Sequence, residues 1–139
     1  MVNGVLKHWL RNIFLGFMNK RTVIIGATPN PSRYAFLAAT MLQEEGIEFI
    51  PVGIKSGSVL GVPIAPIYEK PPIEQVDTIT LYIGPQHQPE HEQYILSLKP
   101  KRVIFNPGTE NPEFEQKLKG AGIETLEACT LVLLRTGQY

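Results

Sequence analysis

Residues 23–52 read VIIGATPNPSRYAFLAATMLQEEGIEFIPV. The β-branched run Val23–Ile25 ends at Gly26 and is typical of a buried strand. Residues 34–45 carry apolar side chains at helical spacing, and residues 49–52 form a second apolar run. A strand, a helix and a strand within this length predict a βαβ unit, in which the two strands are parallel and the crossover is right-handed.

The rest of the chain continues this alternation. Strands are predicted at 78–83, 102–105 and 124–126, helices at 90–98 and 112–119, and a closing apolar segment at 131–134. Between residues 53 and 72 no helical period appears, and only a short strand at 62–64 is expected. The order of elements predicts an α/β fold with a doubly wound, Rossmann-like parallel sheet that is covered by helices on both faces.

The composition excludes several classes of protein. The 139 residues include 13 Lys and Arg and 13 Asp and Glu. No stretch gathers the positive charges into the basic face that a nucleic-acid binder needs. The single cysteine, Cys129, rules out an internal disulfide and a cysteine-based zinc site. We therefore expect a cytoplasmic protein that does not bind nucleic acid.

Residues 1–19 differ from the rest, and we expect them to be an extension that precedes a single domain at 20–139. Their apolar side chains recur at helical spacing: Val5, Leu6, Trp9, Leu10, Ile13, Phe14 and Phe17. This pattern fits a short amphipathic helix that lies on the domain or on a membrane, but it is too short to span one. The alternative, which we favour, is that Met18 is the natural start and that no membrane is involved.

The turn after the first strand is the first candidate site, because ligands of parallel sheets bind where the strands end. Its candidate ligand contacts are Gly26, Ala27, Thr28, Asn30, Ser32 and Arg33. Gly26 permits a tight exit from the strand, Ser32 is the expected N-cap of the helix, and Arg33 adds a charged fork. Such a turn suits a phosphate, although it lacks the glycine spacing of a dinucleotide fingerprint or a P-loop. The same polar residues would also suit a plain helix cap.

The loop after the second strand contains Gly53 and Lys55 and no acidic residue. NAD-binding domains usually place a carboxylate there to hold the ribose hydroxyls. A lysine followed by Ser56 instead suits a phosphorylated ribose. This favours CoA, with its 3′-phosphate, or NADP, with its 2′-phosphate, over NAD. The alternative is an ordinary solvated lysine on a loop.

Patterns for metal binding or catalysis are weak. His87 and His91 are four residues apart, but Pro89 lies between them, so only His91 falls in the predicted helix. Cys129 has no histidine beside it in the sequence and is expected to be a structural thiol. Since neither an acid–base pair nor a nucleophile motif is recognisable, we expect no catalytic residue and no metal.

Taken in order, several short motifs resemble a known family. They are Gly26–Tyr34, Ile50-Pro51-Val52, Leu60-Gly61, Tyr68, Asn106-Pro107-Gly108 and Glu127-Ala128-Cys129. Their order is similar to that of the small stand-alone CoA-binding domain proteins, which resemble the nucleotide-binding domain of the succinyl-CoA synthetase alpha subunit. The resemblance covers about residues 20–135. Two positions depart from it, since Gly53-Ile54 stands where the family commonly has Asn-Pro, and Ala128 stands where it often has arginine.

The resemblance implies a Rossmann-like domain that binds CoA through its adenosine-phosphate half, with no catalytic residue of its own. Applied to the matching positions of this sequence, the resemblance implies that the phosphates are contacted by Gly26, Thr28, Ser32 and Arg33. It also implies that Lys55 contacts the nucleotide, and that the adenine lies beside Ile83, Gly84 and Pro85. Asn106 and Gly108, after the next strand, complete the expected site.

Three functional hypotheses follow. The first is a binding module that holds CoA or an acyl-CoA by its phosphates and carries out no reaction. The second is an NADP-dependent enzyme, or an acyl-transfer subunit, whose catalytic groups come from a partner. The third is a regulatory subunit that senses the level of CoA or NADP. The identity of any protein partner is left open by the sequence.

Overall fold

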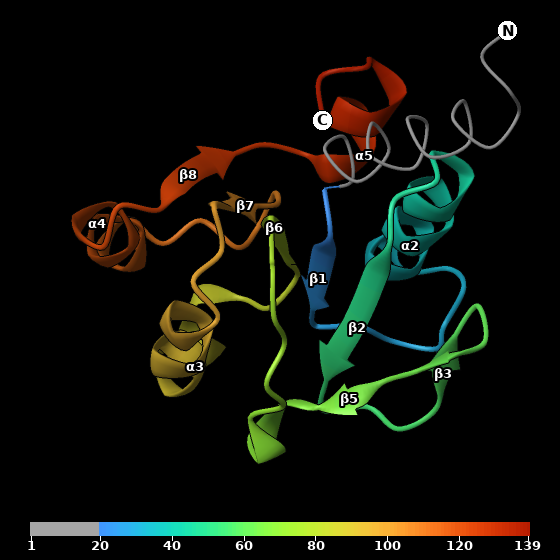
Figure 1. The fold of residues 1–139 in the computed structure, drawn as a ribbon, viewed down its shortest axis with the longest axis horizontal. Helices are drawn as coiled ribbons and strands as arrows, with labels where there is room; N and C mark the ends of the chain where they lie inside the picture. Colours follow the sequence, from blue (N-terminus) through green and yellow to red (C-terminus); the bar gives the residue numbers. More distant parts are fainter. Residues whose placement is uncertain (1–19) are drawn as a thin grey trace, which may run out of the picture.

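The protein is built on one six-stranded parallel sheet (Figure 1). The computed structural model describes residues 20–139, so the predicted extension at 1–19 lies outside the described residues. The strands are β1 (Thr22–Ile25), β2 (Phe49–Gly53), β5 (Ala65–Pro66), β6 (Thr78–Leu81), β7 (Arg102–Phe105) and β8 (Glu124–Glu127). Their order is β5-β2-β1-β6-β7-β8, and each adjacent pair is parallel. The predicted doubly wound, Rossmann-like sheet is confirmed.

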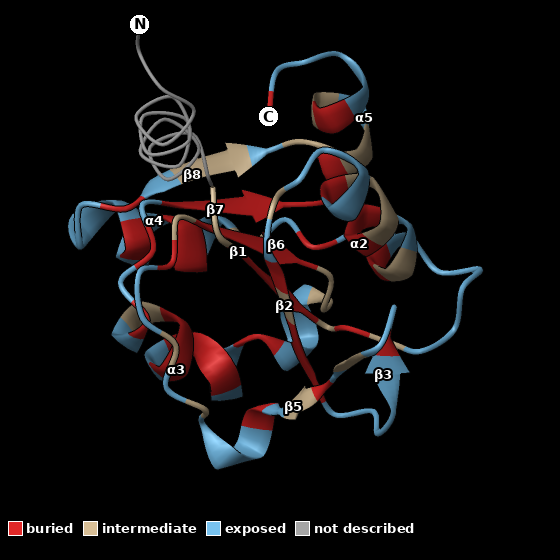
Figure 2. Cartoon of the chain, turned by 45° about the vertical axis from the view of Figure 1, so that its right-hand side comes forward, coloured by how far each residue is buried: buried red, intermediate tan, exposed pale blue. Residues whose placement is uncertain are grey.

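Helices cover both faces of the sheet. On one face lie α2 (Tyr34–Glu44) and α5 (Thr130–Arg135), and on the other α3 (Glu92–Ser97) and α4 (Pro112–Gly120). Alternate side chains of β1 supply the two cores: Val23 packs toward the α3 and α4 face, and Ile24 toward the α2 and α5 face. Figure 2 shows the consequence, since the central strands are buried along their length.

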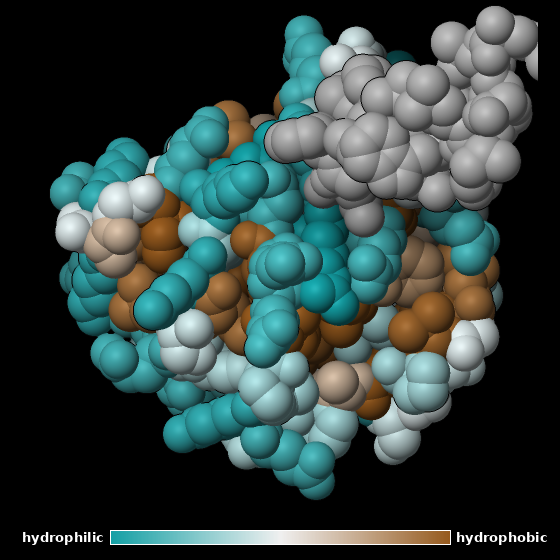
Figure 3. Space-filling model, in the orientation of Figure 1, coloured by the Kyte–Doolittle hydropathy of each residue, from teal (hydrophilic) through white to brown (hydrophobic). Residues whose placement is uncertain are grey.

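The surface is mixed in character. Figure 3 shows one face of the molecule, on which hydrophobic residues are interspersed with hydrophilic ones. Within residues 20–139, the large apolar or aromatic residues with high exposure are Tyr34, Leu37, Ile54, Leu60, Tyr68 and Val132. Within residues 20–139, no helix has both the length and the apolar composition needed to cross a membrane.

The topology places a cleft between β1 and β6. From β1 the chain forms β2 on one side, then crosses to β6 on the other side of β1. The loops that leave β1 and β6 therefore diverge, and the carboxyl ends of these two strands border the space between them. Such a reversal point is where open α/β sheets bind their ligands.

Several local predictions need correction. Strand β5 was not predicted, and the short strand expected at 62–64 is β4 (Val62–Pro63), which pairs with β3 (Ser58–Val59) in a separate hairpin. The helix predicted at 90–98 begins only at Glu92. It follows two single 3₁₀ turns, η2 (Pro85–His87) and η3 (Pro89–His91), because two prolines interrupt the segment. Another 3₁₀ turn, η1 (Ile67–Glu69), follows β5.

The caps of α2 and α4 contrast. Asn111 caps α4 as its sequence pattern predicts, since its Oδ1 accepts a hydrogen bond from the Phe114 N–H at 3.2 Å. The expected cap at Ser32 is wrong: Arg33 occupies the N-cap position of α2, with φ −89° and ψ 149°, and no side chain caps the helix.

Candidate functional site

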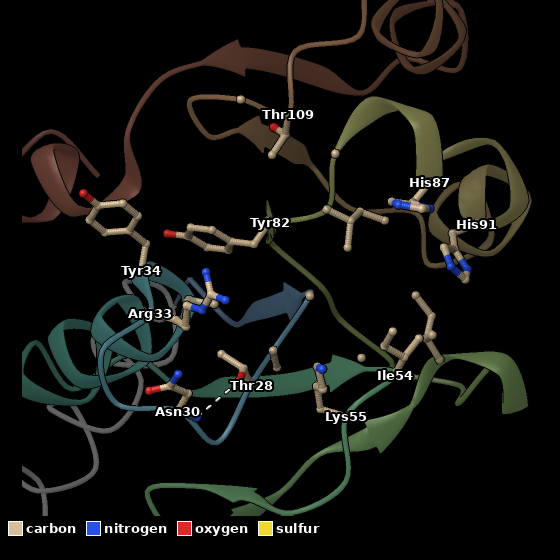
Figure 4. Close-up of a pocket in the computed structure, with 18 of the residues that line it drawn as sticks. Thr28, Asn30, Arg33, Tyr34, Ile54, Lys55, Tyr82, His87, His91 and Thr109 are labelled. Carbon is tan, nitrogen blue, oxygen red and sulfur yellow. Dashed lines mark hydrogen bonds between the residues drawn. The ribbon is translucent and has the colours of Figure 1, made fainter.

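A cleft of about 1110 Å³ opens at the carboxyl ends of the central strands (Figure 4). Ten residues predicted from the sequence line it: Gly26, Ala27, Thr28, Asn30, Arg33, Gly53, Lys55, Ile83, Gly84 and Gly108. Ligand pockets commonly enclose roughly 300–1,000 Å³. The cleft therefore has room for an extended ligand.

Two glycines bring the strand ends close together at its floor. Gly26 has φ +96°, and a Cβ built on it would lie 2.9 Å from the carbonyl carbon and oxygen of Tyr82. A Cβ on Gly53 would lie 2.9 Å from the Ala27 carbonyl oxygen. The N–H groups of Gly26 and Ala27 both donate to the Val52 carbonyl, at 2.9 and 3.1 Å. These two N–H groups therefore hold the turn in place, and because they are bonded within the protein they are not free to bind a ligand.

The amino end of α2 supplies free donors to the cleft. The N–H groups of Tyr34 and Ala35 have no acceptor within residues 20–139, and both residues line the cleft. Free N–H groups at a helix start, together with the positive end of the helix dipole, form a ready site for an anion.

The turn before α2 is held by its own side chains. Asn30 Oδ1 accepts hydrogen bonds from the Ser32 backbone N–H at 3.0 Å and from the Ser32 hydroxyl at 2.8 Å. The Asn30 N–H donates to Thr28 Oγ1 at 3.2 Å, the bond drawn in Figure 4. The Thr28 hydroxyl hydrogen and the Asn30 amide hydrogens are left for a ligand, because neither is donated within residues 20–139.

Two cations point into the same space. Arg33 and Lys55 are exposed, and Figure 4 shows both charged groups directed into the cleft from its lower wall. Among the residues that the structure describes, neither forms an ion pair. Arg33 beside the helix N-terminus and Lys55 farther along the cleft are two unneutralised positive charges, which suit the cleft to an anionic ligand.

On the side of Lys55 away from Arg33, Figure 4 places Ile54, His87 and His91 in the cleft wall. Ile67, Tyr68, Ile83 and Glu90 also line the cleft. The Tyr68 hydroxyl donates to Glu90 Oε1 at 3.1 Å, and His91 Nε2 lies 3.3 Å from the same oxygen. The hydrogen bond to Glu90 and the negative charge of that carboxylate raise the pKa of Tyr68.

Tyr34 and Tyr82 line the cleft on the Arg33 side, and Thr109 lies on the wall across from Arg33 and Lys55 (Figure 4). Burial raises the pKa of Tyr82 to about 12, so its hydroxyl is protonated at neutral pH. Gln88 joins the loop after β6 to the loop after β7, because its Nε2 donates to the carbonyls of Ile83 and Thr109 at 3.0 and 2.7 Å.

Three predicted site residues do not line the cleft: Ser32, Pro85 and Asn106. The polar atoms of the buried Asn106 side chain are used within the protein. Its Nδ2 donates to Thr80 Oγ1 at 2.8 Å and to the Leu81 carbonyl at 3.0 Å, and its Oδ1 accepts from the Thr130 N–H at 2.9 Å. Asn106 thus ties β6, β7 and α5 together.

The metal and thiol candidates do not form a centre within residues 20–139. No group of three or more His, Cys, Asp or Glu side chains in that part of the chain is arranged to hold a metal ion. His87 and His91 are both in the cleft wall, each in its own 3₁₀ turn. Cys129 is half-buried at the N-cap of α5 and does not line the cleft.

Comparisons with known proteins agree with this geometry. Residues 20–135 match the family described as a CoA binding domain. A solved structure of an uncharacterized protein is 59% identical, has a TM-score of 0.84, and is matched over 87% of this chain and 98% of its own. A protein from Thermus thermophilus is 28% identical, with a TM-score of 0.75 and coverage of 95% and 98%.

A hypothetical protein from Pyrococcus horikoshii OT3 shares the fold at 23% identity, with a TM-score of 0.75 and coverage of 96% of this chain and 92% of its own. No curated protein matches the chain.

Proposed function

The chain belongs to the CoA binding domain family, and from this we propose that its cleft binds CoA or an acyl-CoA through the nucleotide phosphates, without making or breaking a bond. The single observation that carries the proposal is the anion site of Arg33, Lys55 and the free amino end of α2. A domain that holds a ligand with several phosphates needs such a set of donors, which stays unneutralised until the ligand arrives.

The two cations lie at separate places, which suits the separate phosphate groups of CoA. Arg33 is at the N-cap of α2, so it and the N–H groups of Tyr34 and Ala35 would hold the pyrophosphate. Lys55 follows β2, where Rossmann-like domains hold the ribose, and would hold the 3′-phosphate.

The polar groups around the phosphates favour binding over chemistry. Thr28, Asn30, Arg33 and Lys55 present hydrogen-bond donors or positive charge to the cleft. Donors of this kind stabilise a phosphate, whereas a reaction needs a nucleophile or a base within reach of the reacting atom. The proposed role is therefore that of a carrier or sensor of CoA.

Thermal denaturation with added nucleotides tests the proposal. A ligand at a hundred times its dissociation constant adds about 2.7 kcal/mol of stability. For a domain of this size that gain raises the melting temperature by roughly 5–10 °C. We expect CoA to produce this shift and NAD to produce none. A flat response to millimolar CoA together with a clear response to NADP would instead support an NADP-dependent enzyme.

A further inference from the structure

Glu90 is held in a defined position in the wall of the cleft. One of its carboxylate oxygens, Oε1, is 3.1 Å from the Tyr68 hydroxyl and 3.3 Å from His91 Nε2. The rings of Tyr68 and His91 are also close, with centroids 5.3 Å apart and planes inclined by 55°. The hydrogen bond and the ring contact of Tyr68 therefore join η1 to η3.

The second carboxylate oxygen of Glu90 is available to a ligand. Oε2 has no hydrogen-bond partner within residues 20–139, and the Glu90 side chain is 52% exposed. The His91 side chain beneath it is only 8% exposed, so the cluster is anchored at its inner side and open toward the cleft. An ionised carboxylate can only accept hydrogen bonds, so this oxygen favours a ligand group that carries N–H or O–H.

The surroundings of Glu90 suit a flat ring. Ile54, Ile67 and Ile83 all line the cleft, and Ile54, which lies beside Lys55 in Figure 4, is 69% exposed. Exposed apolar and aromatic side chains commonly stack against nucleotide bases, whose faces need no hydrogen bond. In Figure 4, Ile54 and Lys55 lie on the His91 side of the cleft, while Arg33 lies toward Tyr34.

The 3′-phosphate and the adenine of CoA are carried by one ribose, so a 3′-phosphate at Lys55 keeps the adenine within about a ribose's width of that lysine. With the pyrophosphate at Arg33, the adenine is directed to the other side of Lys55, where Figure 4 shows Ile54 and His91. The adenine 6-amino group is an N–H donor on the edge of the ring. We propose that Glu90 recognises this amino group through its free oxygen, with Tyr68 and His91 as positioning residues. The inference rests on the proposed function and adds selectivity for a 6-aminopurine.

Calorimetric titration with CoA and with its purine analogue, in which hydrogen replaces the 6-amino group, tests this role. Wild-type protein is expected to bind the analogue about tenfold more weakly, the effect of one charge-assisted hydrogen bond at a half-exposed site. Glu90→Ala is expected to bind the two ligands within about twofold of each other, because the discriminating acceptor is gone. Tyr68→Phe should reduce the difference in affinity between CoA and the analogue without lowering the affinity for the analogue, because it only loosens the position of Glu90.

Glu69→Ala is the matched control. Glu69 is an exposed carboxylate next to Tyr68 that does not line the cleft, so this variant should keep the wild-type discrimination. Equal affinity of the wild-type protein for the two ligands would overturn the role of Glu90, as would full discrimination by Glu90→Ala. Both results leave the proposed function intact, because CoA still binds. If CoA does not bind at all, it is the proposed function that fails.

Discussion

Gly26 shows how one residue determines whether a ligand can approach the sheet. Its φ of +96° is rarely adopted by residues with a side chain, and an added Cβ would lie 2.9 Å from the Tyr82 backbone. Gly26→Ala therefore combines backbone strain with overlap and is expected to cost at least about 2 kcal/mol of unfolding free energy. Urea denaturation measures this loss directly.

The control for that variant is Gly120→Ala. Gly120 is the last residue of α4, its φ lies outside the positive region, and a Cβ built on it meets no atom within 4 Å. The expected result is unchanged stability, or a gain of up to about 1 kcal/mol from better helix propensity. Equal stabilities of Gly26→Ala and Gly120→Ala would contradict the close approach of the β1 and β6 loops.

At individual residues, the sequence indicates which loops reach the cleft but not which contacts their side chains form. Arg33 and Lys55 both line the cleft, because they lie in the turn and the loop that follow the first two predicted strands. Ser32 was assigned the cap because serine is a favoured N-cap residue, but its hydroxyl bonds to Asn30 and the helix starts one residue later. A helix cap by Ser32 and a hydrogen bond from Ser32 to Asn30 would both satisfy the polar side chains of this turn, so the pattern alone does not separate them.

At the scale of elements, the start of α2 has no side-chain cap, which lowers the stability of the helix and leaves its first N–H groups free for an anion. Arg33 at its N-cap has the extended backbone of a capping residue, but it has no side-chain oxygen to give to the free N–H groups. Arg33→Asn is expected to add that acceptor and to stabilise the unliganded protein by about 1 kcal/mol, or about 4 °C in melting temperature. The same change removes a positive charge, and its side-chain oxygen occupies one of the free N–H groups at the start of α2. The affinity for CoA should therefore fall.

Thermal denaturation of Arg33→Asn with and without CoA measures both effects. The expected pattern is a higher melting temperature without ligand and a smaller shift with CoA than in the wild type. A variant that melts earlier, or that keeps the full shift, would show that the amino end of α2 does not serve the ligand.

The elements that sequence reasoning missed are those defined by tertiary contacts. Strand β5 has only two residues, one of them proline, and it is a strand because it pairs with the end of β2 at the sheet edge. Likewise, Tyr68 and Glu90 are 22 positions apart, and no local period predicts that they meet. The long strands and helices, by contrast, carry continuous apolar patterns, and these were located within a few residues.

At the scale of the whole molecule, the described domain and the family agree in extent. The family match covers residues 20–135, and the 59% identical structure is matched over 98% of its length by 87% of this chain. We therefore propose that residues 20–139 are the functional unit and that CoA binding does not require residues 1–19. Within this unit, we propose that the cleft holds CoA by both the pyrophosphate and the 3′-phosphate.

Calorimetric titration of the protein with CoA and with dephospho-CoA, which lacks the 3′-phosphate, tests whether both phosphate groups are recognised. Lys55→Ala is expected to lower the affinity for CoA by about ten- to a hundredfold, because it removes a charge-assisted contact worth about 1.5–3 kcal/mol. The same substitution should hardly change the affinity for dephospho-CoA, because that ligand has no 3′-phosphate for Lys55 to bind. Arg33→Ala should weaken both ligands alike, because both carry the pyrophosphate. Equal affinity of the wild-type protein for CoA and dephospho-CoA would contradict the proposal that this cleft holds CoA by its 3′-phosphate, at Lys55, as well as by its pyrophosphate.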